Sequence, residues 1–227
     1  GEMEEFSNTY KQVYSDFLIN LKHDFSSFLK GKLTLGNNLW HNNTKDLYQR
    51  GRSMNVPGFY NLSNFTDLYA GNYEETTRTA AMFFDGGLDY KDIIYINITG
   101  RNEWSSTFGE NKNNFFYPSV NTSFVFSELI NIPKMNFGKI RMGYAESGIS
   151  PSAYSSTSVY SRSNFTDGFT SGIGYPYLGQ NGFSKSKTIG NADLKPERQK
   201  GIELGADIRF YDNRLRLDAT YYNQKSV

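Results

Sequence analysis

The chain has 227 residues and a formal net charge of +1, with 24 basic and 23 acidic residues. Hydrophobic residues make up 37% of it and the mean hydropathy is −0.60, yet it contains 17 tyrosines and 18 phenylalanines. The balanced charge offers no basic footprint for nucleic acid, and the many aromatic residues are unlike a disordered chain. The absence of cysteine excludes disulfides and thiolate metal sites.

Apolar and polar residues alternate with period two through most of the chain, which predicts an all-β fold. About eight strands are expected, at residues 12–22, 27–39, 77–90, 93–104, 116–127, 137–148, 200–210 and 214–223. No run of about 18 apolar residues exists, so a transmembrane helix is not expected. We therefore expect an antiparallel up-and-down meander.

The predicted connections alternate between short and long along the chain. Short turns are expected near 23–24, 91–92 and 212–213, a moderate connection at 128–136, and long connections at 40–76, 105–115 and 149–199. Outer-membrane barrels have this arrangement, because their periplasmic turns are short and their extracellular loops are long. The pattern therefore favours part of a large transmembrane β-barrel.

The hairpin at 200–223 shows the difference between the two faces of the sheet most clearly. One face carries only apolar residues, among them Ile208 and Leu217, while charges occupy most positions on the other. The charged residues are Glu203, Asp207, Arg209, Arg214, Arg216 and Asp218. A membrane barrel with an aqueous lumen suits such a sheet, and lumen charges are expected to pair across strands. The alternative is a soluble all-β glycan-binding or interaction module that buries its apolar face.

Four sequence motifs follow one another in the C-terminal half. They are GRNEWSSTF at 100–108, FYPSVNTSFVFSEL at 116–129, GKIRMGYAESG at 138–148 and NADLKPERQKGIELGADIRFYDNRLRLDATYYN at 191–223. In this order they resemble the SusC/RagA family of TonB-dependent outer-membrane receptors, known from Bacteroidetes. Residues before about 90 resemble that family only in their general barrel-strand character.

The resemblance implies an outer-membrane barrel of about 22 strands, together with an N-terminal plug domain. It implies import of an oligosaccharide or peptide, with a SusD-type lipoprotein and the TonB complex as partners and outer-membrane lipid around the barrel. Residues 1–227 are expected to be a partial barrel domain, without the plug and without the closing C-terminal strand. No signal peptide opens the chain, so it is expected to be a piece of a longer protein or to begin with a cloning remnant.

Aromatic residues are concentrated in the two longest predicted connections. Because aromatic rings stack on sugar faces and anchor peptides, we expect ligand contacts there. The candidates are Trp40, Tyr60, Tyr69, Tyr73, Tyr154, Tyr160, Tyr175 and Tyr177. His23 and His41 are expected at opposite ends of one strand and therefore cannot share a metal. No cofactor motif or catalytic constellation is recognised, so the chain is not expected to be an enzyme.

Overall fold

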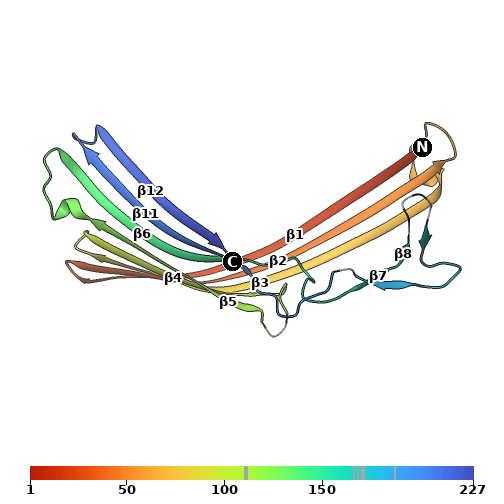
Figure 1. The fold of residues 1–227 in the computed structure, drawn as a ribbon, viewed down its shortest axis with the longest axis horizontal. Helices are drawn as coiled ribbons and strands as arrows, with labels where there is room; N and C mark the ends of the chain where they lie inside the picture. Colours follow the sequence, from red (N-terminus) through yellow and green to blue (C-terminus); the bar gives the residue numbers. More distant parts are fainter. Residues whose placement is uncertain (110–111, 166, 168, 170–171, 187) are drawn as a thin grey trace.

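A computed structural model describes residues 1–109, 112–165, 167, 169, 172–186 and 188–227. Eight strands form one antiparallel sheet that curves as half of a barrel, in the order β1-β2-β3-β4-β5-β6-β11-β12 (Figure 1). The strands are β1 (Glu2–Ser26), β2 (Leu29–Met54), β3 (Phe65–Tyr90), β4 (Ile94–Ser105), β5 (Asn114–Val125), β6 (Met135–Ile149), β11 (Glu197–Phe210) and β12 (Leu215–Ser226). Consecutive long strands are therefore neighbours, and the predicted all-β meander is confirmed.

The connection between β6 and β11 contains two small ribbons. One pairs β7 (Tyr160–Arg162) with β10 (Phe183–Lys185), and the other pairs β8 (Asn164–Phe165) with β9 (Ile173–Gly174). Among the residues that the structure describes, helical structure is limited to the 3-10 turns η1 (Leu62–Asn64) and η2 (Phe126–Glu128). Within the described residues, none of the helices has the length and apolar character needed to cross a bilayer.

Successive connections alternate between the two ends of the long strands, but their lengths differ less than the sequence predicts, because 126–134 has nine residues and 106–113 has eight. The connections at 27–28, 91–93, 126–134 and 211–214 lie together at the left in Figure 1. The others, at 55–64, 106–113 and 150–196, leave the opposite ends of their strands. We refer to these two ends as the short-turn end and the long-loop end of the sheet.

The predicted long connection at 40–76 is wrong, because β2 and β3 continue to pair with each other far beyond residue 40. The pairing runs on through Asp46 opposite Tyr73 and Arg50 opposite Tyr69, which leaves only 55–64 as a connection. β1 likewise begins at Glu2 instead of residue 12. The extensions lack the regular apolar alternation that reveals a strand, because polar residues separate the aromatic ones on one face and occupy most of the other.

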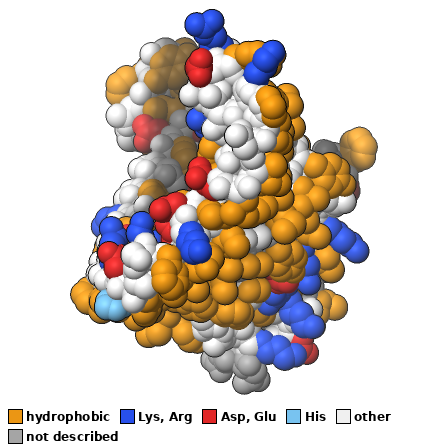
Figure 2. Space-filling model, turned by 90° about the vertical axis from the view of Figure 1, so that its left-hand side faces the viewer, with side chains coloured by type: hydrophobic (Ala, Val, Ile, Leu, Met, Phe, Trp, Pro, Cys, Tyr) orange, Lys and Arg blue, Asp and Glu red, His pale blue; other side chains and the backbone are white. Residues whose placement is uncertain are grey.

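The register places apolar side chains from all eight strands on one face of the sheet. For example, Ile19 lies opposite Leu35, and Leu35 lies opposite Phe84. We call this set the apolar band: Phe17, Ile19, Leu21, Leu33, Leu35, Leu39, Ala80, Met82, Phe84, Leu88, Ile94, Ile96, Ile98, Val120, Phe124, Ile140, Met142, Leu204, Ile208, Leu217 and Tyr221. Figure 2 shows hydrophobic side chains gathered along the outer, convex side of the curved sheet, while polar and charged ones line its hollow.

The apolar band is exposed, which disfavours the soluble module considered as the alternative, because such a module would bury this face. Phe17 is 64% exposed and Leu217 is 57% exposed, and the buried hydrophobic residues of the described chain are few and scattered. An apolar surface of this extent marks contact with another apolar phase. In β3 the band runs from Ala80 to Leu88, which matches the roughly 9–11 residues that a strand needs to cross a bilayer.

Candidate functional site

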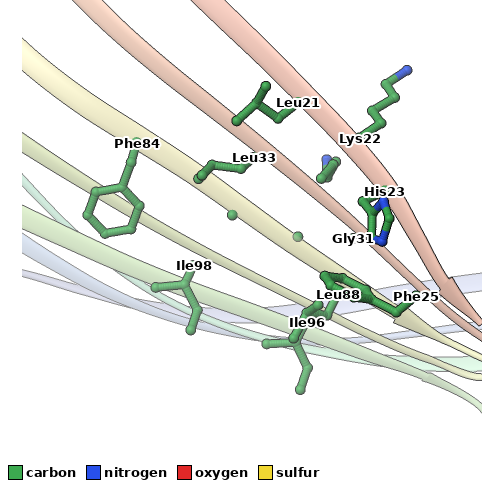
Figure 3. A pocket seen from close by; sticks show the side chains of 13 residues that line it. Leu21, Lys22, His23, Phe25, Gly31, Leu33, Phe84, Leu88, Ile96 and Ile98 are labelled. Carbon is green, nitrogen blue, oxygen red and sulfur yellow. The ribbon is translucent and has the colours of Figure 1, made fainter.

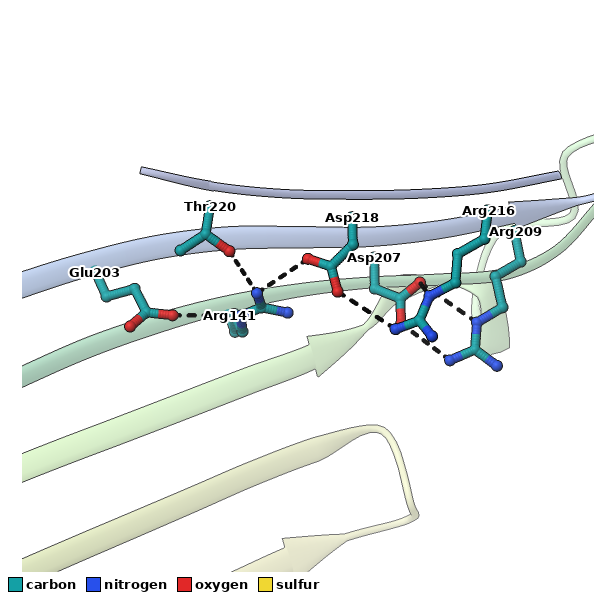
Figure 4. Close-up of polar contacts among 7 residues, drawn as sticks. All are labelled: Arg141, Glu203, Asp207, Arg209, Arg216, Asp218 and Thr220. Carbon is teal, nitrogen blue, oxygen red and sulfur yellow. Dashed lines mark hydrogen bonds and ion pairs between the residues drawn. The ribbon is translucent and has the colours of Figure 1, made fainter. Parts of the chain in front are cut away.

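The concave face of the sheet carries a network of ion pairs near the short-turn end, on β6, β11 and β12 (Figure 4). Asp207 lies at its centre and is only 6% exposed. Its carboxylate accepts hydrogen bonds from Arg209 at 2.9 Å and from Arg216 at 3.0 Å. Because Arg209 is two residues along the same strand and Arg216 comes from β12, the pairs join neighbouring strands on one face.

Arg141 of β6 connects this network to a second set of acceptors. Its guanidinium lies 3.0 Å from Asp218 and 3.5 Å from Glu203, and it donates a hydrogen bond of 2.5 Å to Thr220. Arg141 can cross β11 because its register partner is Gly205, where any side chain would overlap the guanidinium. The close approach therefore requires glycine at this position.

The predicted pairing of lumen charges across strands is confirmed for Glu203, Asp207, Arg216 and Asp218, whereas Arg209 pairs with Asp207 of its own strand. Arg214 instead lies in the turn 211–214 and takes no part in the ion pairs of the described residues. Arg141 was missed, although its place on the polar side of β6, two residues after Lys139, marks it as facing the same side.

A second polar cluster joins β1, β2 and β4 on the same face. Arg101 donates hydrogen bonds to Asn38 at 2.6 Å and to Glu103 at 2.8 Å. The buried Asn38 amide in turn donates to the carboxylate of Asp16 and, at 3.3 Å, to the hydroxyl of Tyr14. These hydrogen bonds link β1, β2 and β4 on the concave face, at the height of the sheet where β1 to β3 extend beyond the apolar band.

An aromatic strip continues from this cluster toward the long-loop end of the sheet. The rings of Tyr14 and Trp40 are 4.9 Å apart, and the Arg101 guanidinium lies 6.0 Å from the Trp40 ring. Cross-strand register places the other members of the strip on the same concave face. The strip consists of Phe6, Tyr10, Tyr14, Trp40, Tyr48, Tyr69 and Tyr73.

Tyr73 is tied to the acid two residues further along β3. Its hydroxyl donates a 2.6 Å hydrogen bond to Glu75. This bond, with smaller contributions from burial and from the nearby charges of Glu75 and Tyr154, raises the pKa of Tyr73 to about 12.

The candidates fall into two groups in the structure. Trp40, Tyr69 and Tyr73 lie in strands and not in a loop, which corrects the prediction because β2 and β3 are longer than expected. The others lie in the connections: Tyr60 in 55–64, and Tyr154, Tyr160, Tyr175 and Tyr177 in 150–196.

In the part of the chain that the structure describes, no side-chain contact joins the loop candidates with one another. Tyr175 contacts Phe165 edge-on at 6.3 Å between ring centroids, and the backbone of Tyr177 pairs with Gln180. Phe6, Tyr10 and Tyr14 were missed as site residues, although their spacing of four puts them on one face of a strand.

The convex face has a hollow of about 500 Å³ within the apolar band (Figure 3). It opens over Gly31 and Gly86, which have no side chains to fill it. Its walls are Leu21, Leu33, Phe84, Leu88, Ile96 and Ile98, with His23 and Phe25 at one end. Its apolar lining suits hydrocarbon. His23 and His41 do not form a metal site, and no cluster of three or more potential ligands occurs in the described residues.

An open sheet with a hydrocarbon-type outer face and an ionic inner face has the architecture of a membrane barrel wall. The family described as TonB dependent receptor-like, beta-barrel matches residues 3–226. The chain belongs to this family, whose members are transporters and receptors of the outer membrane and not a class of enzymes.

Individual relatives agree with this assignment. TonB-dependent receptor P39 of Formosa agariphila is 25% identical over 171 residues, which cover 74% of this chain and 15% of that protein. The structure of the RagAB peptide transporter superposes with a TM-score of 0.80 at 18% identity, over 98% of this chain and 24% of that one. The siderophore receptor PiuA from Acinetobacter baumannii gives a TM-score of 0.53 at 14% identity, over 96% of this chain and 32% of that one.

These matches confirm the predicted resemblance to SusC/RagA receptors. The chain spans only 15% of the curated relative and 24% of the RagAB chain. Its described residues form the half-barrel and the connections at its two ends.

Proposed function

We propose that residues 1–227 form one partial barrel domain in the wall of an outer-membrane importer that takes up peptides or oligosaccharides. The observation that carries the proposal is the two-sided sheet, in which the apolar band faces outward and the ion network faces inward. Each strand between the two edges of the sheet satisfies its backbone through its neighbours, and all eight present apolar side chains to lipid. The long-loop end then faces the outside of the cell and the short-turn end faces the periplasm.

In this proposal the wall guides the substrate, and other parts of the longer protein open and close the path. The resemblance implies a plug domain, the TonB complex as the source of energy and a SusD-type lipoprotein as partner. The RagAB structures, which describe a peptide importer, support the peptide over the oligosaccharide as the first substrate to test.

The aromatic strip is the part of the wall that we propose contacts the substrate. Its members lie on the concave face above the ion network, and Tyr10, Tyr14, Tyr69 and Tyr73 are each about half exposed. Aromatic rings with exposed faces can stack on sugars or on peptide side chains without large conformational cost. The loop candidates, among them Tyr154, extend this surface toward the outside.

The test is uptake by cells that make the full-length receptor, offered a fluorescently labelled peptide pool or a labelled oligosaccharide pool. Tyr14→Ala combined with Trp40→Ala should lower uptake of the imported pool about tenfold, because two stacking surfaces are lost. Phe28→Ala, an equally exposed aromatic change at the short-turn end, should leave uptake unchanged. Uptake of neither pool by the unaltered receptor, or equal uptake by both variants, would contradict the proposal.

A further inference from the structure

A second hollow, of about 580 Å³, lies on the convex face where β1 to β4 leave the apolar band toward the long-loop end. We call it the rim pocket. Val13, Leu39, Ala80 and Trp104 give it an apolar floor, and His41 and Arg78 line its upper part. One pocket thus joins the apolar band to a polar margin on the outside of the wall.

Arg78 is held in place at this margin. Its Nε donates a 3.2 Å hydrogen bond to Nδ1 of His41, its register partner on β2. Its backbone N–H donates to the hydroxyl of Ser106, and its backbone carbonyl accepts from the Ser106 N–H, both at 2.9 Å. The remaining guanidinium nitrogens are exposed and have no carboxylate partner in the part of the chain that the structure describes.

Lys11 adds a second positive charge to the same margin. It lies two residues from Val13 on β1, so both side chains stand on the convex face. Further out, Lys45 lies opposite Glu74 in register, and the Glu74 carboxylate accepts a 3.0 Å hydrogen bond from Asn43, the register partner of Lys11. Neither Arg78 nor Lys11 forms an ion pair with an acid among the described residues, so both cations are available beside the rim pocket.

We propose that the rim pocket binds a phosphorylated lipid of the outer leaflet. The phosphate would lie between Arg78 and Lys11, and an acyl chain would lie over Leu39 and Val13 along the apolar band. Arginine forms bidentate hydrogen bonds with phosphate, and basic side chains at a membrane surface attract anionic headgroups. A free phosphate ion would use the charges but not the apolar floor, so the pocket fits the lipid better.

This inference depends on the proposed membrane location but not on which substrate is imported. The test uses the purified full-length receptor in detergent and native mass spectrometry with added lipid A, the bisphosphorylated glycolipid of outer membranes. Arg78→Gln combined with Lys11→Gln should weaken binding about 25-fold, at about fivefold for each cation removed. Lys91→Gln with Lys134→Gln removes the same charge at the short-turn end and should bind like the unaltered receptor.

Three controls decide the result. Dephosphorylated lipid A should bind the unaltered receptor as weakly as lipid A binds the double variant, and Arg78→Lys should keep most of the affinity. Equal lipid A binding by both double variants would overturn the inference, as would displacement of the lipid by millimolar inorganic phosphate. If the proposed membrane location is wrong, neither the variants nor the unaltered receptor will retain lipid. This outcome distinguishes failure of the proposed function from failure of the lipid-binding inference alone. Unchanged thermal stability of the variants would show that they are folded.

Discussion

Tyr73 illustrates how single residues on the concave face are fixed by neighbours two positions along the same strand. Side chains at this spacing share a face, so the Tyr73 hydroxyl reaches Glu75 without a loop or a second strand. The same spacing pairs Arg209 with Asp207 and Arg101 with Glu103. These hydrogen bonds hold exposed polar side chains in one orientation, which a surface that binds a substrate requires.

The Tyr73 pair makes a prediction about pH. The hydrogen bond to Glu75 favours the neutral phenol, so its contribution to folding is complete below about pH 10 and is lost as the pH rises through about 12. Glu75→Gln should return the pKa of Tyr73 toward 10, because a neutral amide repels the phenolate less. Ultraviolet titration of the full-length receptor, with Tyr73→Phe to identify the phenolate, measures the shift.

Glu74→Gln is the matched control for this titration, because it removes the neighbouring acid on the convex face. It should leave the pKa of Tyr73 near 12. A phenolate that still titrates near 12 in Glu75→Gln would show that the hydrogen bond is not its cause.

At the scale of the element, each long strand of the sheet has one side that faces outward and one side that faces the hollow of the sheet. In β12, Leu215, Leu217 and Tyr221 belong to the outward side, while Arg216, Asp218 and Thr220 belong to the concave side and its ion network. β1 to β3 then continue past the apolar band as polar extensions that carry the aromatic strip. Each of β1, β2 and β3 therefore consists of a segment that faces lipid, within the apolar band, and a segment that faces solvent, beyond it.

The outward side of β12 can be tested with a single charge. Leu217→Arg should destabilise the full-length barrel by about 2–4 kcal/mol, because the guanidinium would have to enter the hydrocarbon layer. Tyr222→Arg places the same group on the concave side, opposite Glu203, and should change the free energy of unfolding little. Denaturant titration in detergent or lipid vesicles measures both, and equal losses would mean that Leu217 does not face lipid.

At the scale of the whole molecule, the half-barrel has two open edges. β1 pairs only with β2 and β12 pairs only with β11, so one side of each edge strand has backbone groups without a partner strand in the described residues. Unpaired edges attract further strands, and within a bilayer they carry a large free-energy cost. Both edges therefore need strands that this sheet does not supply.

Residues 1–227 made alone, without detergent, should associate through these edges or through the apolar band. Light scattering should show oligomers, and a dye that binds apolar surface should become fluorescent. A stable monomer that binds no dye would contradict both the exposed band and the open edges. The full-length receptor in detergent is the reference for a closed wall.

The sequence determined the fold class and the family, since alternation along 200–223 and the four ordered motifs depend only on local order. It also determined the two faces of the sheet, because side-chain direction in a strand is fixed by period two. The three-dimensional fold was needed to show that β2 and β3 pair as far as 54 and 65, that Gly205 makes room for Arg141, and that Arg78 contacts His41. Those facts depend on which residues of neighbouring strands lie opposite each other. Segments with water on both faces lack the regular apolar alternation from which this register could be deduced.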